Sequence, residues 1–171
     1  TDLSEPRYGV AVLNDCKYGI SACGGQLRLS LHKGGMRPDF RGDKGMHYCE
    51  YGFLPHMGGF SAENVIQPAD AFNYHPIVLD GDRSIEPLLF CDAPNVVAET
   101  VKPCEDGERA FVLRLYEAEG SFTHAGIALG FQPKGIELTN MLEERQEAME
   151  AARDFRLTFR PFEIKTVKVR Y

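Results

Sequence analysis

The feature that most constrains this fold is a series of short apolar runs separated by turn-forming residues. The runs occupy residues 88–90, 96–101, 111–116 and 127–131, and Asp, Asn, Pro and Gly lie between them. Short strands broken by turns at this spacing are typical of a β-sandwich. A final alternating run covers residues 162–169, and its phase slips once at Thr166 and Val167, which predicts a β-bulge there.

The first half of the chain also has strand-like patterns. An apolar run at residues 8–13 predicts one strand, and residues 47–54 predict another that ends at Pro55. Leu27, Leu29 and Leu31 alternate with polar residues, which is the period of a half-buried strand. Because Gly24 and Gly25 precede them, we expect a hairpin that turns at these two glycines.

Two segments favour short helices within this mainly β chain. Ser61 is a plausible N-cap for a helix that runs to about Phe72, although Pro68 interrupts its pattern. Residues 141–153 combine Met, Leu and Ala with Glu, Arg and Gln, so local propensity predicts a helix capped by Thr139 or Asn140. The four glycines and one proline of residues 34–45 predict a long loop, and loops of this length are often functional.

Length and charge limit the classes of function. With 171 residues and a polar turn at residues 80–83, we expect two parts, 1–79 and 84–171, which could also form one continuous domain. The 19 basic and 25 acidic residues give a net charge of −6, which argues against nucleic-acid or membrane-surface binding. No apolar run approaches the roughly 18 residues of a spanning helix. The first residue is Thr1 rather than Met, so we expect a processed or excised piece.

The five cysteines do not form a recognisable framework. Their number is odd and no C-x-x-C pair occurs among Cys16, Cys23, Cys49, Cys91 and Cys104. We therefore expect free thiols in a reducing compartment, the cytoplasm.

Few residues carry a chemical motif. The five histidines show no H-x-D or H-x-x-E-H spacing, and the chain has no P-loop and no nucleophile elbow. Asp43 and His47 lie in D-x-G-x-H beside the glycine-rich loop. One interpretation is an ordinary turn that Asp43 supports through its own backbone, and the other is a sugar pocket that both side chains face. The pattern alone leaves both open.

Longer motifs resemble the C-terminal region of zinc-dependent α-mannosidases of glycoside hydrolase family 38. They are NDCKYG at residues 14–19, LRLSL at 27–31, D-x-G-x-H at 43–47, Pro55-His56 and RPFEIKT at 160–166, and they occur in order along nearly the whole chain. The resemblance implies a mainly all-β fold. A C-terminal part of a galactose-mutarotase-like supersandwich would be followed by a smaller antiparallel β-sandwich, with one or two short helices.

The resemblance places the chemistry of such enzymes outside this sequence. Family members are large retaining exo-α-mannosidases whose catalytic carboxylates and zinc ligands come mainly from an N-terminal domain, and no catalytic or metal residue maps here. We therefore expect no cofactor in this chain and Zn in the full-length parent. The resemblance implies an active-site rim or sugar-contact role for Asn14, Asp15, Lys33, Asp43 and His47. Lys33 stands where relatives often have arginine, which removes a bidentate donor.

Two functions are expected, the first from the resemblance and the second from the β-sandwich pattern, the tyrosines and the polar glycine-rich loop. In the first, the chain is a structural region that packs on its own N-terminal catalytic domain, is inactive alone, and contributes to hydrolysis of mannose-containing oligosaccharides by the parent. In the second, it is an autonomous carbohydrate-binding module. The alternative to both is a packing domain with no ligand of its own, because a fold alone does not establish a function. A face exposed by excision would favour a homo-oligomer.

Overall fold

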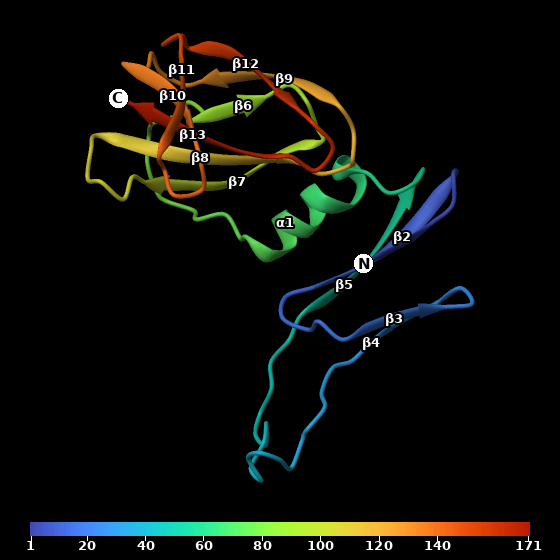
Figure 1. The fold of residues 1–171 in the computed structure, drawn as a ribbon. Coiled ribbons are helices and arrows are strands. Elements are labelled where there is room, and N and C mark those ends of the chain that lie inside the picture. The colour runs from blue at the N-terminus through green and yellow to red at the C-terminus, as the bar shows by residue number, and fades with distance from the viewer. The chain divides into compact units, whose positions relative to one another are not determined.

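The computed structural model describes every residue from Thr1 to Tyr171 and divides into two compact units, Thr1–Leu79 and Asp80–Tyr171 (Figure 1). Antiparallel strands dominate both units, so the prediction of a mainly β fold is confirmed. No helix of the structure has the length and apolar character needed to cross a membrane.

The first unit contains a three-stranded antiparallel sheet in the order β1-β2-β5. Its strands are β1 (Asp2–Ser4), β2 (Tyr8–Asn14) and β5 (Tyr51–Met57). The predicted end of a strand at Pro55 is wrong, because Pro55 lies inside β5 opposite Val10. Since β5 forms the edge of the sheet, the missing N–H of Pro55 removes no bond to a further strand.

A helical segment covers one face of this sheet and confirms the helix predicted from Ser61. It consists of a π-helical turn η1 (Ala62–Ile66) followed by α1 (Gln67–Asn73). The Ser61 hydroxyl accepts a hydrogen bond from the Asn64 N–H at 3.0 Å, which caps the first turn. Pro68 lies in the first turn of α1, where its missing N–H removes no intrahelical bond. The apolar side chains between helix and sheet are Ala11, Leu13, Leu54, Val65, Ala69 and Phe72.

The predicted glycine hairpin is present in the same unit. Strands β3 (Ile20–Cys23) and β4 (Gln26–Leu29) pair around Gly24 and Gly25, whose φ angles are 56° and 74°. A two-residue turn with positive φ at both positions matches the twist of the strands and suits glycine. Residues 34–45 form no helix or strand, in agreement with the predicted loop.

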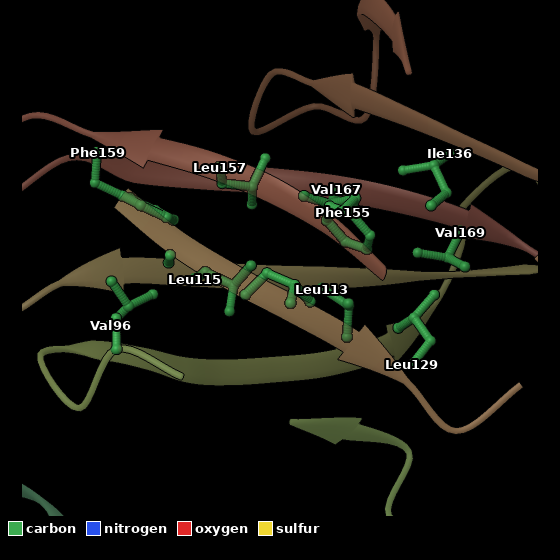
Figure 2. Close-up of a cluster of buried hydrophobic side chains, with 13 residues drawn as sticks. Val96, Leu113, Leu115, Leu129, Ile136, Phe155, Leu157, Phe159, Val167 and Val169 are labelled. Carbon is green, nitrogen blue, oxygen red and sulfur yellow. The ribbon is translucent and has the colours of Figure 1, made fainter. Parts of the chain in front are cut away.

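The second unit is an antiparallel β-sandwich of two sheets. One sheet has the order β11-β10-β13-β8-β7 and the other β12-β9-β6. The strands are β6 (Leu89–Cys91), β7 (Val96–Pro103), β8 (Ala110–Glu117), β9 (Thr123–Leu129), β10 (Gly135–Thr139), β11 (Arg145–Met149), β12 (Asp154–Phe159) and β13 (Ile164–Arg170). Figure 2 shows Leu113, Leu129 and Phe159 pointing into the layer between the sheets, where the core lies.

The helix predicted over residues 141–153 is wrong. This segment contains the edge strand β11, which pairs with β10 so that Met149 lies opposite Ile136. The Asn140 carboxamide oxygen accepts hydrogen bonds from the N–H groups of Leu142 and Glu144, and Glu143 has a φ of 65°. A tight turn therefore replaces the first helical turn, and the sheet edge outweighs local helix propensity.

The bulge predicted at Thr166 and Val167 is also wrong, because β13 keeps a continuous register with both β8 and β10. The pattern breaks because the apolar Ile164 lies on the same side of β13 as Thr166 and Lys168, away from the core, where it is 55% exposed. The same side also holds buried polar groups. Lys168 is 3% exposed and pairs with Asp106 and with Glu108 at 3.2 Å. Bulges occur instead in β7, between Ala98 and Thr100, and in β11, between Arg145 and Glu147.

A buried carboxylate joins the loops at one end of the sandwich. Glu117 is 0% exposed, and one of its oxygens accepts from the Gly120 and Phe162 N–H groups at 2.7 and 3.0 Å. The other accepts from the Glu119 N–H at 3.0 Å and the Asn95 amide at 2.8 Å. Burial alone would raise the pKa of Glu117, but these donors outweigh it and lower the pKa to about 2.

Candidate functional site

Three of the five predicted site residues line one cleft in the first unit. The cleft has a volume of about 650 Å³ and contains Lys33, Asp43 and His47. The other lining residues are Cys16, Lys17, Tyr18, Gly19, Ser30, Leu31 and His32. Residues from the turn after β2, from the segment after β4 and from the glycine-rich loop therefore meet at this cleft.

The glycine-rich loop holds His47 through the main chain. The imidazole Nε2 of His47 lies 2.6 Å from the Asp43 carbonyl oxygen, which accepts a hydrogen bond from it. Asp43 has a φ of 48°, a left-handed conformation that aspartate tolerates in turns. The Asp43 carboxylate therefore does not orient the imidazole, and both side chains are exposed at the cleft. The geometry supports the turn interpretation and leaves polar groups available to a ligand.

The structure adds His32 to this group. The His32 and His47 rings lie 4.5 Å apart between centroids, with an interplanar angle of 53°. Sequence reasoning missed His32 because it stands at a position without a motif. It could have been found only from its place directly before Lys33.

Asn14 and Asp15 do not line the cleft but form the turn that leads into it. The Asn14 carboxamide oxygen accepts from the Lys17 N–H at 2.7 Å, which closes a turn at the end of β2. The Asp15 carboxylate is hydrogen-bonded to the Cys16 thiol, which lowers the pKa of Asp15 and raises that of Cys16. These two residues position Cys16, Lys17 and Tyr18 rather than facing the cleft themselves.

The sheet of the first unit is apolar on both faces. We call the side of β2 and β5 that faces away from the helix the outer face. Its side chains are those of Tyr8, Val10, Val12, Tyr51 and Phe53. Two hollows of about 580 and 330 Å³ lie between this face and Leu27 of the hairpin. Phe53 is 72% exposed and Tyr8 54% exposed. Since protein interiors are close-packed, the hollows show that the hairpin covers this face only incompletely.

The residues present do not form a metal centre. No three or more His, Cys, Asp or Glu side chains come together in a position to hold an ion. His56 belongs to one of the motifs of the resemblance, but its imidazole Nε2 lies 2.8 Å from the carboxylate Oδ1 of Asp2. Both side chains are almost fully buried. A chemical step through zinc therefore has no support in the residues of this chain.

Comparison with known proteins identifies the family. Residues 1–41 match the "Glycosyl hydrolases family 38 C-terminal domain", and residues 95–167 match the "Glycosyl hydrolases family 38 C-terminal beta sandwich domain". The chain is similar to alpha-mannosidase 2C1 of Homo sapiens, with 38% identity over 172 residues, 95% of this chain and 16% of that protein. It is also similar to alpha-mannosidase G of Dictyostelium discoideum, with 33% identity over 178 residues.

A further relative is the alpha-mannosidase of Saccharomyces cerevisiae, with 30% identity over 194 residues. The matches cover 98% of this chain in the Dictyostelium and yeast proteins, but 16% and 18% of those proteins. The chain thus spans less than a fifth of the length of these relatives. The two family domains match in order on either side of residues 42–94, in a fold with a C-terminal β-sandwich. The chain belongs to glycosyl hydrolase family 38, as a C-terminal domain of an α-mannosidase.

Proposed function

We propose that this chain is a non-catalytic structural region of a retaining, zinc-dependent α-mannosidase that removes terminal mannosyl residues from oligosaccharides. The proposal is supported by the family match together with the incompletely covered outer face of the β1-β2-β5 sheet. In the intact enzyme the catalytic carboxylates and the zinc ligands would come from the preceding N-terminal domain. This chain would contribute packing surface and the rim residues of its cleft.

The outer face supports packing against the rest of such an enzyme. Tyr8, Val12 and Phe53 present apolar side chains that burial would stabilise at about 25 cal/mol per Å² of apolar area. An antiparallel sheet needs only one apolar face when the other is solvated. A second apolar face therefore favours a covering partner, the N-terminal part of the enzyme.

The chain alone is expected to give no turnover of an aryl α-mannoside, with or without added Zn²⁺, because no three or more potential metal ligands come together in it and the resemblance places the catalytic carboxylates in another domain. Product release is measured by absorbance against a no-protein blank and an intact α-mannosidase as positive control. Turnover that a chelator abolishes would overturn the structural role.

The same face is expected to make the isolated chain self-associate. Exposed contiguous apolar surface is usually covered in soluble proteins, here by a second copy when the catalytic domain is absent. Light scattering measures the mass at several concentrations, and Phe53→Ser is expected to shift it toward the monomer of 19.1 kDa. A monomer at all concentrations would contradict this expectation.

A second candidate function is autonomous sugar binding at the cleft. It is favoured by the polar side chains of Lys33, Asp43 and His47 on one concave surface. NMR titration of the chain with mannobiose would then shift the His47 ring signals at millimolar sugar, whereas Lys33→Ala and a galactose control would not show this change. Unchanged spectra at high sugar concentration would favour the scaffold role.

We also propose a reducing compartment, the cytoplasm, for this protein. The support is that all five cysteines are free thiols in the structure.

A further inference from the structure

Two cysteines lie at the end of the β2–β5 ladder. The last registered pair of these strands is Asn14 with Tyr51. The Asp15 N–H donates to the Glu50 carbonyl at 3.2 Å, so the pairing continues one residue beyond both strands. Continued by one more residue, the same register would set Cys16 opposite Cys49.

The hydrogen-bond pattern of the ladder determines whether Cys16 and Cys49 would lie at a hydrogen-bonded or at a non-hydrogen-bonded position. At the other end of the ladder, the Gly58 N–H donates to the Arg7 carbonyl at 2.8 Å. Arg7 and Asp15 differ by eight positions, an even number. Both therefore lie at hydrogen-bonded positions of the alternating antiparallel pattern. Cys16 and Cys49 then occupy a non-hydrogen-bonded position, where opposing Cα atoms are typically about 4.5 Å apart.

This spacing falls within the Cα separation that a disulfide spans, about 4.4 to 6.8 Å. Two further observations support closeness of the side chains. The Cys16 Sγ lies 3.8 Å from the carbonyl oxygen of Tyr48, the neighbour of Cys49. Cys49 is also among the groups whose charge acts on the Cys16 thiol. Both thiols are accessible, since Cys16 is exposed and Cys49 is partly exposed.

We propose that Cys16 and Cys49 form a redox pair that a small external disulfide, such as oxidised glutathione, converts to an intramolecular disulfide. The Cys49 thiolate attacks one sulfur of the external disulfide, forming a mixed disulfide and releasing one glutathione thiolate. Cys16 then loses its proton to solvent and attacks the Cys49 sulfur, which releases the second glutathione thiolate. The two protein thiols are oxidised to one disulfide, and the external disulfide is reduced to two thiols.

Hydrogen bonding to Asp15 raises the pKa of the Cys16 thiol, which lowers its thiolate fraction. This assigns the second attack to Cys16, since proximity to the mixed disulfide offsets a small thiolate fraction. The disulfide would close the segment of residues 17–48, which carries Lys33, Asp43 and His47, at the mouth of the cleft that Cys16 lines.

The other cysteines have no such partner. Cys23 lies opposite Gln26 in the hairpin, and Cys91 and Cys104 belong to the second unit. Cys104 is buried as well. Cys23 therefore provides a matched control, since it is exposed, lies in the same unit and faces no second thiol.

The test uses the whole folded chain, treated with oxidised glutathione and then alkylated in denaturant. Mass spectrometry is expected to find two of the five thiols protected and an intact mass about 2 Da lower before alkylation, because two hydrogens are lost. Peptide mapping should join Cys16 to Cys49, and a reductant should restore both thiols. Cys16→Ser and Cys49→Ser should each abolish the cross-link, whereas Cys23→Ser should leave it unchanged.

Four results would overturn the proposal. The first is retention of five alkylatable thiols, and the second is stable glutathione adducts without a cross-link. The third is a cross-link that involves Cys23, and the fourth is the same mixture of several pairings in the folded and in the guanidinium-unfolded chain. Circular dichroism of each serine variant confirms that it is folded, and Cys16→Ala serves if Cys16→Ser is not.

Discussion

Glu117→Gln is expected to lower the free energy of unfolding of the sandwich by about 2–4 kcal/mol. Each oxygen of Glu117 accepts two hydrogen bonds, from N–H groups of two loops and from Asn95. The glutamine NH₂ would replace one acceptor with a donor facing two further donors in a site with no access to water. The size of the side chain stays the same, so the effect reports hydrogen bonding rather than a cavity.

The measurement is hydrogen exchange of the slowest amides in β8 and β13, which reports the second unit separately from the first. Fluorescence is less suitable because the chain contains no tryptophan. Glu147→Gln, the same change at an exposed position of β11, is expected to stay within about 0.5 kcal/mol. Equal stability of the two variants would show that the Glu117 contacts do not stabilise the sandwich.

The low pKa of Glu117 sets the pH range of this effect. Its folded value of about 2 lies below the usual 4.5, so the carboxylate stabilises the folded state fully above about pH 5. The contribution is lost as the pH falls from 4.5 toward 2, where the folded carboxylate is protonated. The difference between the native chain and Glu117→Gln should therefore shrink over this range, as followed by unfolding in denaturant at each pH.

Phe159→Ala is expected to destabilise the sandwich by about 3–5 kcal/mol. Phe159 is 0% exposed and is the largest of the fully buried side chains, between the two sheets (Figure 2). Its truncation removes apolar contacts with both layers and leaves a cavity that rigid strands only partly close.

The control is Phe90→Ala in β6 of the same sheet, where the side chain is 64% exposed. Its expected cost is below about 1 kcal/mol, since little apolar area returns to water. Amide exchange in β8 and β13 again provides the measurement. A Phe159→Ala chain as stable as Phe90→Ala would place the core elsewhere.

Local signals were sufficient where neighbouring residues decide the conformation. Ser61 caps its helix through Asn64, and Gly24 and Gly25 form a two-residue turn because both need positive φ. The run at residues 111–116 became the interior strand β8, since apolar β-branched and aromatic residues fit a buried sheet. Such features depend on a few adjacent residues, which a single sequence contains.

Predictions failed where distant residues decide the conformation. Residues 145–149 have helix-forming composition but complete an edge of the sheet beside β10, and their register is set by Met149 opposite Ile136. The short strands β1, β10 and β12 were not predicted. The apparent phase slip at Thr166 arose because the apolar Ile164 lies on the face of β13 away from the core and is 55% exposed.

The candidate site shows the same division. The motif spacing singled out Asp43 and His47, but it did not place Lys33 and His32 beside them, and Asn14 and Asp15 lie in a turn outside the lining. Their proximity depends on how β2, the hairpin and the glycine-rich loop leave the sheet. Whether these residues contact a sugar stays a prediction.

The sequence by itself determined the mainly β architecture, the hairpin, the capped helix and the family. Strand periodicity, turn residues and motifs each depend on residues that are close together in the chain. Only the tertiary structure decided the edge strand β11, the burial and hydrogen bonding of the Glu117 carboxylate, and the cleft that Lys33, Asp43 and His47 share. These features join segments separated by tens of residues. Their energies come from burial and register, which exist only once the sheets have formed.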